Sequence, residues 1–122
     1  MNSDSLSDWL GYINSKRPNE KDFGLERLKG VYSELIKKPI AAKTILIAGT
    51  NGKGSTAEFL KNFLFSAGFT VGVYTSPHLI HFNERIRINE NQACDEKIIS
   101  SFKKIEDCKG KTKLTYFDYA TL

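Results

Sequence analysis

A glycine-rich stretch between an apolar run and a helical pattern constrains the fold of this chain most strongly. Thr44–Ala48 is short, apolar and uninterrupted, which is typical of a strand buried on both faces. Gly49–Thr56 follows at once, and apolar residues then return at helical spacing through Ala67, with Gly68 placed to end the helix. A second strand pattern covers Thr70–Tyr74. Strand, loop, helix and strand predict a βαβ unit with two parallel strands and a right-handed crossover.

The glycine-rich stretch has the features of a phosphate-binding loop. Backbone N–H groups and the N-terminus of the following helix attract anions, and Lys53 adds a full positive charge. Gly52 and Gly54 allow the backbone to approach a ligand closely. The spacing departs from the G-x-x-x-x-G-K-[ST] pattern, because two residues separate Gly49 from Gly52 and a glycine follows the lysine. We predict phosphate binding over the alternative, a tight strand-to-helix turn with an exposed lysine.

The remaining pattern predicts a helical N-terminal segment over residues 1–40 and extends the phosphate-loop region over 41–122. Apolar residues at helical spacing place Trp9 in the core. The other expected elements are helices over Leu6–Ile13, Leu25–Ile36 and Asp95–Gly110, a half-exposed strand over Glu84–Ile88, and an apolar element over Lys113–Leu122 that ends without a terminating signal. Asp22 is the candidate N-cap of the second helix.

Composition excludes several classes of protein for these 122 residues. Lys and Arg number 18 against 14 Asp and Glu, and the two signs are interleaved along the chain, so we expect no nucleic-acid partner. No apolar run approaches the ~18 residues of a membrane span. Residues 1–15 lack the basic residues of a targeting peptide. Cys94 and Cys108 fit reduced thiols in a cytoplasmic protein.

Several segments together resemble one enzyme family. The phosphate loop Gly49–Thr56, the segment Tyr74–Leu79 with its Thr-Ser-Pro-His sequence, and Glu84-Arg85-Ile86 are similar to folylpolyglutamate synthase/dihydrofolate synthase of the Mur ligase superfamily. Three further segments agree in order: Trp9–Ile13, Phe23–Arg27 and Leu114–Tyr119. The resemblance covers residues 9–122 and corresponds to the N-terminal portion of such enzymes.

The resemblance implies an α/β fold, namely the N-terminal part of a Mur-ligase-type central ATPase domain with a three-layer P-loop architecture and a parallel sheet. It implies an ATP- and Mg²⁺-dependent amide ligase of folate biosynthesis and one-carbon metabolism. The γ-phosphoryl group of ATP would activate a carboxylate of dihydropteroate or a reduced folate, and the amino group of L-glutamate would displace phosphate from the acyl phosphate. Such an enzyme would act as a cytoplasmic monomer without membrane or nucleic-acid partners.

The resemblance also implies roles for particular residues. Lys53 would be catalytic, and Ser76 would be a hydroxyl ligand of Mg²⁺, whereas its alternative role is to cap the Pro77 turn. His78 and His81 would be loop residues that flank the site. ATP would be held by Gly49, Thr50, Asn51, Gly52, Lys53, Gly54 and Ser55. The pterin or folate would be held by Asp22, Phe23, Gly24, Leu25, Thr115, Tyr116, Phe117 and Asp118. Helix capping is the structural alternative for Asp22 and Asp118.

The chain departs from the family in residues and in length. Asp118 stands where glutamate is more usual, and the chain is several times shorter than the family's proteins. We therefore expect the isolated chain to be an inactive fragment that makes no folate polyglutamate. Two alternatives remain: a Mur-type peptide ligase, disfavoured because Gly54 replaces the usual threonine after the lysine, and a stand-alone nucleotide-binding module without catalysis.

Overall fold

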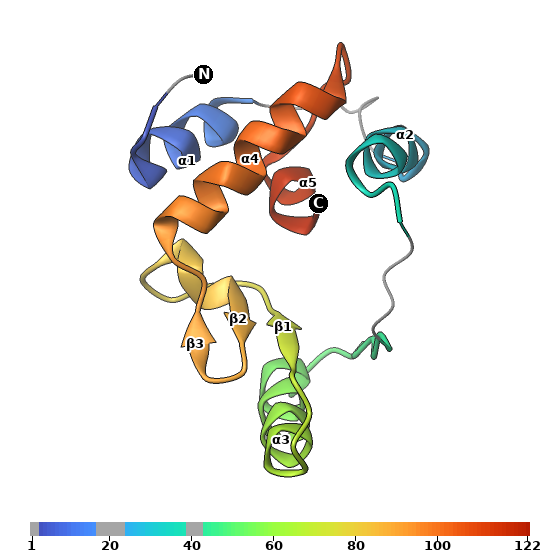
Figure 1. The fold of residues 1–122 in the computed structure, drawn as a ribbon, viewed down its shortest axis with the longest axis vertical. Coiled ribbons are helices and arrows are strands. Elements are labelled where there is room, and N and C mark those ends of the chain that lie inside the picture. Colours follow the sequence, from blue (N-terminus) through green and yellow to red (C-terminus); the bar gives the residue numbers. More distant parts are fainter. Residues whose placement is uncertain (1–2, 17–23, 39–42) are drawn as a thin grey trace. The chain divides into compact units, whose positions relative to one another are not determined.

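The computed structural model describes residues 3–16, 24–38 and 43–122. Two compact units divide the chain: residues 1–41 together with 95–122, and residues 42–94. The C-terminal residues therefore join the N-terminal helices, whereas the sequence pattern divides the chain at residue 40. The elements in chain order (Figure 1) are α1 (Leu6–Ser15), α2 (Glu26–Leu35), α3 (Lys53–Ser66), β1 (Gly72–Tyr74), the 3₁₀ helix η2 (Phe82–Arg85), β2 (Ile86–Ile88), β3 (Asn91–Gln92), α4 (Asp95–Lys109) and α5 (Tyr116–Thr121).

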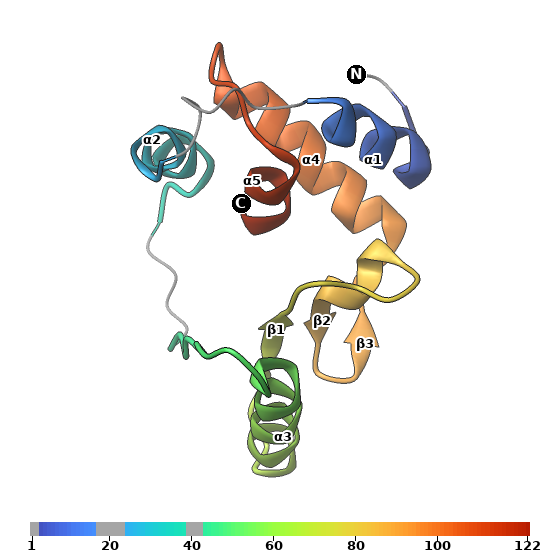
Figure 2. The same cartoon turned by 180° about the vertical axis from the view of Figure 1, so that it is seen from behind.

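The first unit is helical and is organised around α4. This helix contacts both α1 and α2, and α1 also contacts α5 (Figure 2). Trp9 and Ile13 of α1 are fully buried, as is Ile105 of α4, which confirms Trp9 as a core residue. The ring of Phe102 on α4 lies 5.9 Å from Trp9 and 6.1 Å from Tyr119 on α5, between ring centroids. One apolar core thus joins helices that are about ninety residues apart in sequence.

Local capping signals explain where these helices begin. The Ser5 hydroxyl accepts a hydrogen bond from the Asp8 amide at the start of α1. At α5, the Thr115 hydroxyl accepts from the Asp118 amide while the Asp118 carboxylate accepts from the Thr115 amide. This reciprocal arrangement confirms the capping role of Asp118. The other capping candidate, Asp22, lies outside the described residues.

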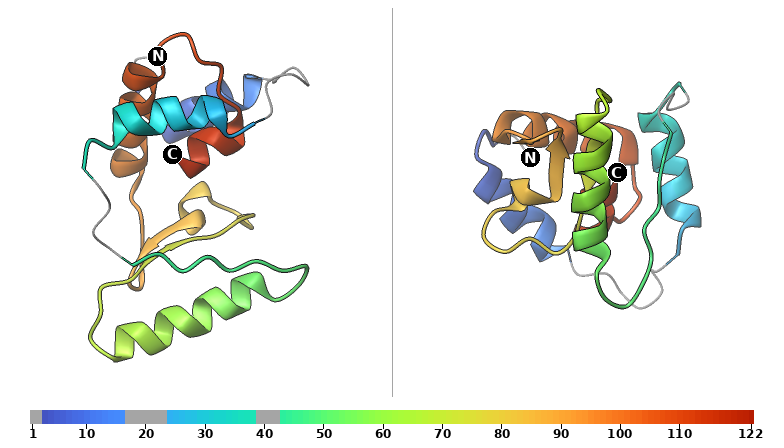
Figure 3. Two further views of the ribbon diagram at one scale, coloured as in Figure 1. Left: turned by 90° about the vertical axis from the view of Figure 1, so that its right-hand side faces the viewer. Right: turned by 90° about the horizontal axis from the view of Figure 1, so that it is seen from below.

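The second unit contains α3 and a small sheet. The three strands follow the order β1-β2-β3 and both pairings are antiparallel, with Val73 opposite Arg87 and Ile88 opposite Asn91. Helix α3 contacts β1 (Figure 3). Gly68 follows the helix with φ +86°, a conformation that suits glycine at a helix end, as the sequence predicts.

A charged cluster joins α3 to the sheet. The Glu58 carboxylate lies 2.6 Å from the Lys61 ammonium and 2.7 Å from the Arg87 guanidinium of β2. Hydrogen bonds from Lys61 and then from Arg87 lower the pKa of Glu58. Lys61 is buried, and its carboxylate partner explains how a charged side chain is accommodated there.

The structure differs from the predicted βαβ unit at its first strand. Thr44–Ala48 belongs to no strand, Leu46 is 90% exposed, and the sheet is antiparallel rather than parallel. A parallel strand requires neighbouring strands and helical cover on both faces. The part of the chain that the structure describes provides neither for Thr44–Ala48, so an apolar segment that would be buried in a complete sheet stays exposed. The two-residue strand β3 was not predicted.

Candidate functional site

The glycine-rich loop leads directly into the N-terminus of α3. Gly52 is the N-cap with φ +76°, a left-handed conformation that glycine adopts without a steric penalty. No side chain caps this helix end, and no acidic residue occupies its first turn. Residues 49–56 are all exposed. The first N–H groups of α3 have no intrahelical acceptor, so this end offers several donors and a positive partial charge to an anion.

Lys53 supplies the formal charge of this loop. Its ammonium group donates to the carbonyl oxygens of Gly49, at 2.7 Å, and Thr50, at 3.4 Å. It forms no ion pair within the described residues. The charge is therefore held beside the loop by neutral acceptors and is available to a phosphate group. The loop and the helix end together form a site suited to a polyphosphate.

A second loop in the same unit, residues 75–85, is held by one carboxylate. Glu84 accepts hydrogen bonds from the backbone amides of Leu79, Ile80 and His81 at 2.8, 2.9 and 2.6 Å. These three bonds lower the pKa of Glu84 to about 2. The sequence places Glu84 in a motif of the family but does not predict that its carboxylate holds the loop amides. Its position a few residues after Pro77 and His78 is the signal that could have suggested this role.

The same loop carries the predicted metal ligand. The Ser76 side chain is exposed, and no hydrogen bond ties its hydroxyl to the described residues. The His78 ring accepts a hydrogen bond at Nδ1 from the Arg85 side chain at 2.8 Å. No group of three or more His, Cys, Asp or Glu residues that could hold a metal ion occurs in residues 3–16, 24–38 and 43–122. A metal here would take Ser76 as one oxygen ligand and others from a bound phosphate and water.

We expect Glu84→Gln to loosen this loop. An amide offers one acceptor oxygen and no charge, so exchange of the Leu79, Ile80 and His81 amides with solvent should accelerate about tenfold, as measured by NMR. Unchanged exchange at these three amides would contradict the assigned function of Glu84.

A pH series and a matched variant complete this test. The folded pKa of Glu84, about 2, lies below the ordinary value of 4.5 for a glutamate side chain. Its contribution to stability is therefore complete above the unfolded pKa and is lost as the pH falls toward 2, so amide protection should persist to about pH 3. Glu34→Gln is the control, because Glu34 accepts from the Lys37 side chain at the surface of α2 and holds no loop amide.

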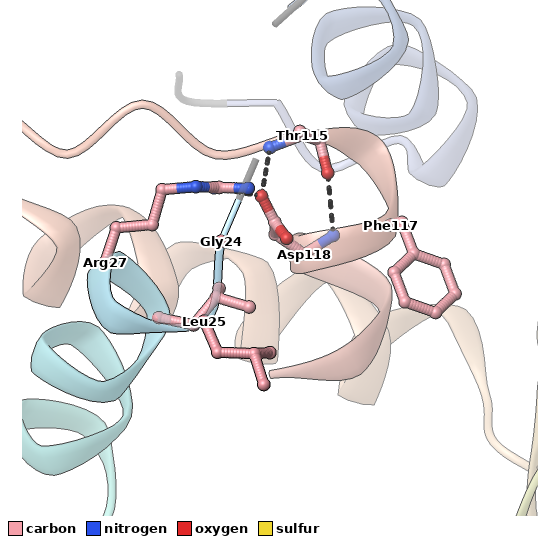
Figure 4. A pocket seen from close by; sticks show the side chains of 7 residues that line it. Gly24, Leu25, Arg27, Thr115, Phe117 and Asp118 are labelled. Carbon is pink, nitrogen blue, oxygen red and sulfur yellow. Dashed lines mark hydrogen bonds and ion pairs between the residues drawn. The ribbon is translucent and has the colours of Figure 1, made fainter. Parts of the chain in front are cut away.

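A pocket in the helical unit gathers most of the predicted pterin residues. It has a volume of about 360 Å³ and is lined by Gly24, Leu25, Arg27, Leu28, Thr115, Phe117 and Asp118 (Figure 4). Five of these residues were predicted from the sequence. Tyr116 is half-buried and does not line the pocket, and Asp22 and Phe23 lie outside the described residues. Lining residues between 24 and 28 form one wall of the pocket, and lining residues between 115 and 118, about ninety positions later in the sequence, form the other.

The polar side chains of this pocket are those of Arg27, Thr115 and Asp118. Asp118 is buried, and its Oδ2 accepts from the Thr115 amide at 2.7 Å and from the Arg27 guanidinium. Arg27 Nη1 also donates to the Lys113 carbonyl oxygen at 3.1 Å. Phe117 presents an aromatic ring that is 57% exposed. An apolar cavity with an exposed ring and a buried carboxylate is suited to a planar, nitrogen-rich ring system.

Sequence reasoning missed Arg27. The residue lies in one of the segments that carry the family resemblance, one turn from Gly24, but its partner Asp118 is 91 positions away in sequence. A signal did exist, because an arginine beside one predicted pocket segment and an acid within the other form an obvious candidate pair.

The sequence is similar to enzymes of one kind. Over 96% of its length the chain is 42% identical to dihydrofolate synthase/folylpolyglutamate synthase of Escherichia coli (strain K12), and 40% identical to the protein of that name from Haemophilus influenzae. The chain spans 28% and 26% of these two relatives. No protein-family model matches it.

Solved structures give the same result. The structure of Escherichia coli FolC in complex with DHPP and ADP matches 99% of this chain with a TM-score of 0.90 at 37% identity, and the chain covers 30% of it. A bifunctional folylpolyglutamate synthase/dihydrofolate synthase from Yersinia pestis, complexed with AMPPNP and Mn ion, matches 99% of the chain with a TM-score of 0.92 at 38% identity, and the chain again covers 30%. These matches confirm the α/β class and the resemblance to this group of ligases.

Among the described residues, no helix has the length and apolar character needed to cross a bilayer.

Proposed function

We propose that the polypeptide containing this chain is an ATP-dependent ligase that adds L-glutamate to dihydropteroate, to reduced folates, or to both, in the cytoplasm. The observation that carries the proposal is the N-terminus of α3, which follows Gly52, begins with Lys53, and has neither a side-chain cap nor an acidic residue in its first turn. The chain that carries it matches such ligases over nearly its whole length. The chain corresponds to part of the ATP-binding domain, with the glutamate-binding domain outside it. We expect the enzyme to act as a monomer without nucleic-acid or membrane partners.

ATP would bind at the glycine-rich loop. The backbone of residues 49–55 would surround the phosphates, and Lys53 would exchange its carbonyl partners Gly49 and Thr50 for phosphate oxygens. The residues fit a magnesium nucleotide, because Ser76 offers an uncommitted hydroxyl and no carboxylate crowds the first turn of α3. When bound, Mg²⁺ would supply charge neutralisation of the phosphates.

We propose that Thr44–Ala48 is a parallel strand of a larger P-loop sheet in the complete protein. Its apolar sequence and its exposed position support this, because Ile45 and Leu46 have no cover within the described residues. Helix α3 supports it too, because Phe59 and Phe63 are also largely exposed. Further strands and helices of the complete protein would bury both segments.

The pterin would bind in the pocket between α2 and α5. Phe117 would stack on the ring system, and the Asp118 carboxylate would accept hydrogen bonds from ring and amino N–H groups. The identity of the lining residues supports this assignment, because Gly24, Leu25 and Thr115 are among the pterin residues that the family resemblance implies.

The family resemblance implies the reaction, and Lys53 is the residue of this chain that would take part in it. An oxygen of the substrate carboxylate attacks the γ-phosphorus of ATP, ADP leaves, and an acyl phosphate forms. The glutamate amine then attacks the acyl carbon, phosphate leaves and the amine loses a proton. Lys53 would hold the transferring phosphoryl group and offset its negative charge, which is the main requirement of phosphoryl transfer.

Ligand binding tests the proposal directly. We expect the 122-residue chain to bind dihydropteroate, observed through pterin fluorescence, and MgADP, observed by calorimetry. A UDP-linked muramyl peptide should not bind. Preference for that peptide would favour the Mur-type alternative, and binding of nucleotide without any pterin would favour the nucleotide-binding module.

A further inference from the structure

The pocket contains a residue whose role the proposed function does not assign. We propose that Arg27 is a positioning residue that holds Asp118 so that one carboxylate oxygen stays free for the ligand, and that it sets the preference of the pocket for a neutral aminopteridine over a cationic one. The inference rests on the proposed function, because it concerns how the same pocket selects its pterin. Figure 4 shows the Arg27 side chain reaching across to Asp118.

The hydrogen bonds divide the two oxygens of Asp118 between different tasks. Oδ2 is occupied, because it accepts from both the Arg27 guanidinium and the Thr115 amide. Oδ1 accepts no hydrogen bond from the described residues. Because Asp118 lines the pocket, Oδ1 is the acceptor that a ligand can use.

Among the described residues, the segment around α5 holds the Arg27 side chain in place. Nη1 donates to the Lys113 carbonyl oxygen and to Asp118, whereas Nε is buried without a partner. The side chain of Asp118 is 5% exposed and that of Arg27 is 21% exposed. Asp118 is the charged partner of Arg27 among the described residues, so the electrostatic effect of Arg27 falls on this carboxylate.

Charge balance determines which ligand such a pocket accepts. Arginine and aspartate together are neutral, so Oδ1 offers a strong hydrogen-bond acceptor without an uncompensated negative charge. A neutral 2-amino-4-oxopteridine, with adjacent ring N–H and amino donors, meets that acceptor. Without Arg27, the buried carboxylate would lack its cation and would favour a positively charged ligand. A 2,4-diaminopteridine, which is the more basic ring system, is such a ligand.

A double-mutant cycle tests the inference in the 122-residue chain. Affinity for dihydropteroate is measured by pterin fluorescence in wild type, Arg27→Met, Asp118→Asn and the double variant. We expect Arg27→Met to weaken binding about tenfold and to shift the preference toward 2,4-diaminopteroate by a similar factor. In the Asp118→Asn background, Arg27→Met should have no further effect, because its action passes through Asp118.

Two variants keep the test informative if Arg27→Met folds poorly. Arg27→Lys keeps the charge, so it should retain the wild-type preference between the two pteridines while losing a few-fold in affinity. Lys29→Met, on the same helix and paired with Glu26 at the surface, should change neither quantity. Circular dichroism of each variant checks the fold.

The possible failures are distinguishable. If wild type binds no dihydropteroate, the proposed function fails and this inference fails with it. If wild type binds but folded Arg27 variants keep both affinity and preference, or if the two substitutions act additively, only the assignment of Arg27 is overturned.

Discussion

Lys53→Ala should lower the turnover of the proposed ligase by ~10²-fold or more, because the ammonium group would offset charge on the transferring phosphoryl group. Within the described residues, the Lys53 ammonium donates hydrogen bonds to the carbonyl oxygens of Gly49 and Thr50, and the residue is exposed. Its loss removes charge from the nucleotide site and little packing. The thermal midpoint should therefore stay close to that of wild type.

Steady-state release of ADP with dihydropteroate and glutamate measures this effect. Lys53→Arg, which keeps the charge but changes its shape, should recover part of the loss. Lys43→Ala is the matched control, because Lys43 is exposed and precedes the apolar segment that leads into the loop. A folded Lys53→Ala protein with near-normal turnover would refute the assigned role.

The helices were predictable because their signals are local. Apolar residues at a 3.6-residue period mark one face of α1 and α4, and the same residues are buried in the structure. Gly68 and Gly110 follow their helices with positive φ, as their positions in the sequence suggest. Such signals depend only on neighbours within one or two turns, so a sequence without relatives is enough to read them.

Strand pairing was predictable only in part, because it depends on distant partners. An apolar run such as Thr44–Ala48 indicates a need for burial, but it does not contain the strands that would flank it. The strand β1 found an antiparallel partner in β2, which is the C-terminal part of the predicted strand Glu84–Ile88, whereas Glu84 and Arg85 belong to the 3₁₀ helix η2. The burial of Thr44–Ala48 by further strands is a proposal, and among the described residues the sheet consists of β1, β2 and β3 and leaves Leu46 exposed.

The candidate sites show the same division between local and distant information. The phosphate loop is continuous in sequence, so its glycines and Lys53 could be identified together. The pocket combines residues about ninety positions apart, and only the family resemblance pointed to both of its walls. The sequence offers Arg27 and Asp118 as a candidate pair of opposite charge, but the structure was needed to show that these residues, 91 positions apart, form a hydrogen bond.

Trp9→Ala should destabilise the helical unit by about 3–5 kcal/mol, because it removes a fully buried aromatic side chain and leaves a cavity between α1 and α4. The substitution also removes the hydrogen bond that the Trp9 indole N–H donates to the Ser3 carbonyl oxygen at 2.9 Å. Phe102 would lose its ring neighbour on one side while keeping Tyr119 on the other. A loss of this size is a large fraction of the stability of an ordinary domain.

Denaturant unfolding followed by far-ultraviolet circular dichroism measures the loss, with Trp9→Phe expected to retain part of the stability. Asn14→Ala, on the exposed face of the same helix, should shift the unfolding free energy by less than about 0.5 kcal/mol. Trp9 supports the unit that contains the proposed pterin pocket, whereas Lys53 lies in the other unit. We therefore expect Trp9→Ala to abolish dihydropteroate binding and to spare MgADP binding. A variant that keeps wild-type stability would show that α1 contributes little to the core, and equal loss of both ligands would show that the two units do not unfold independently.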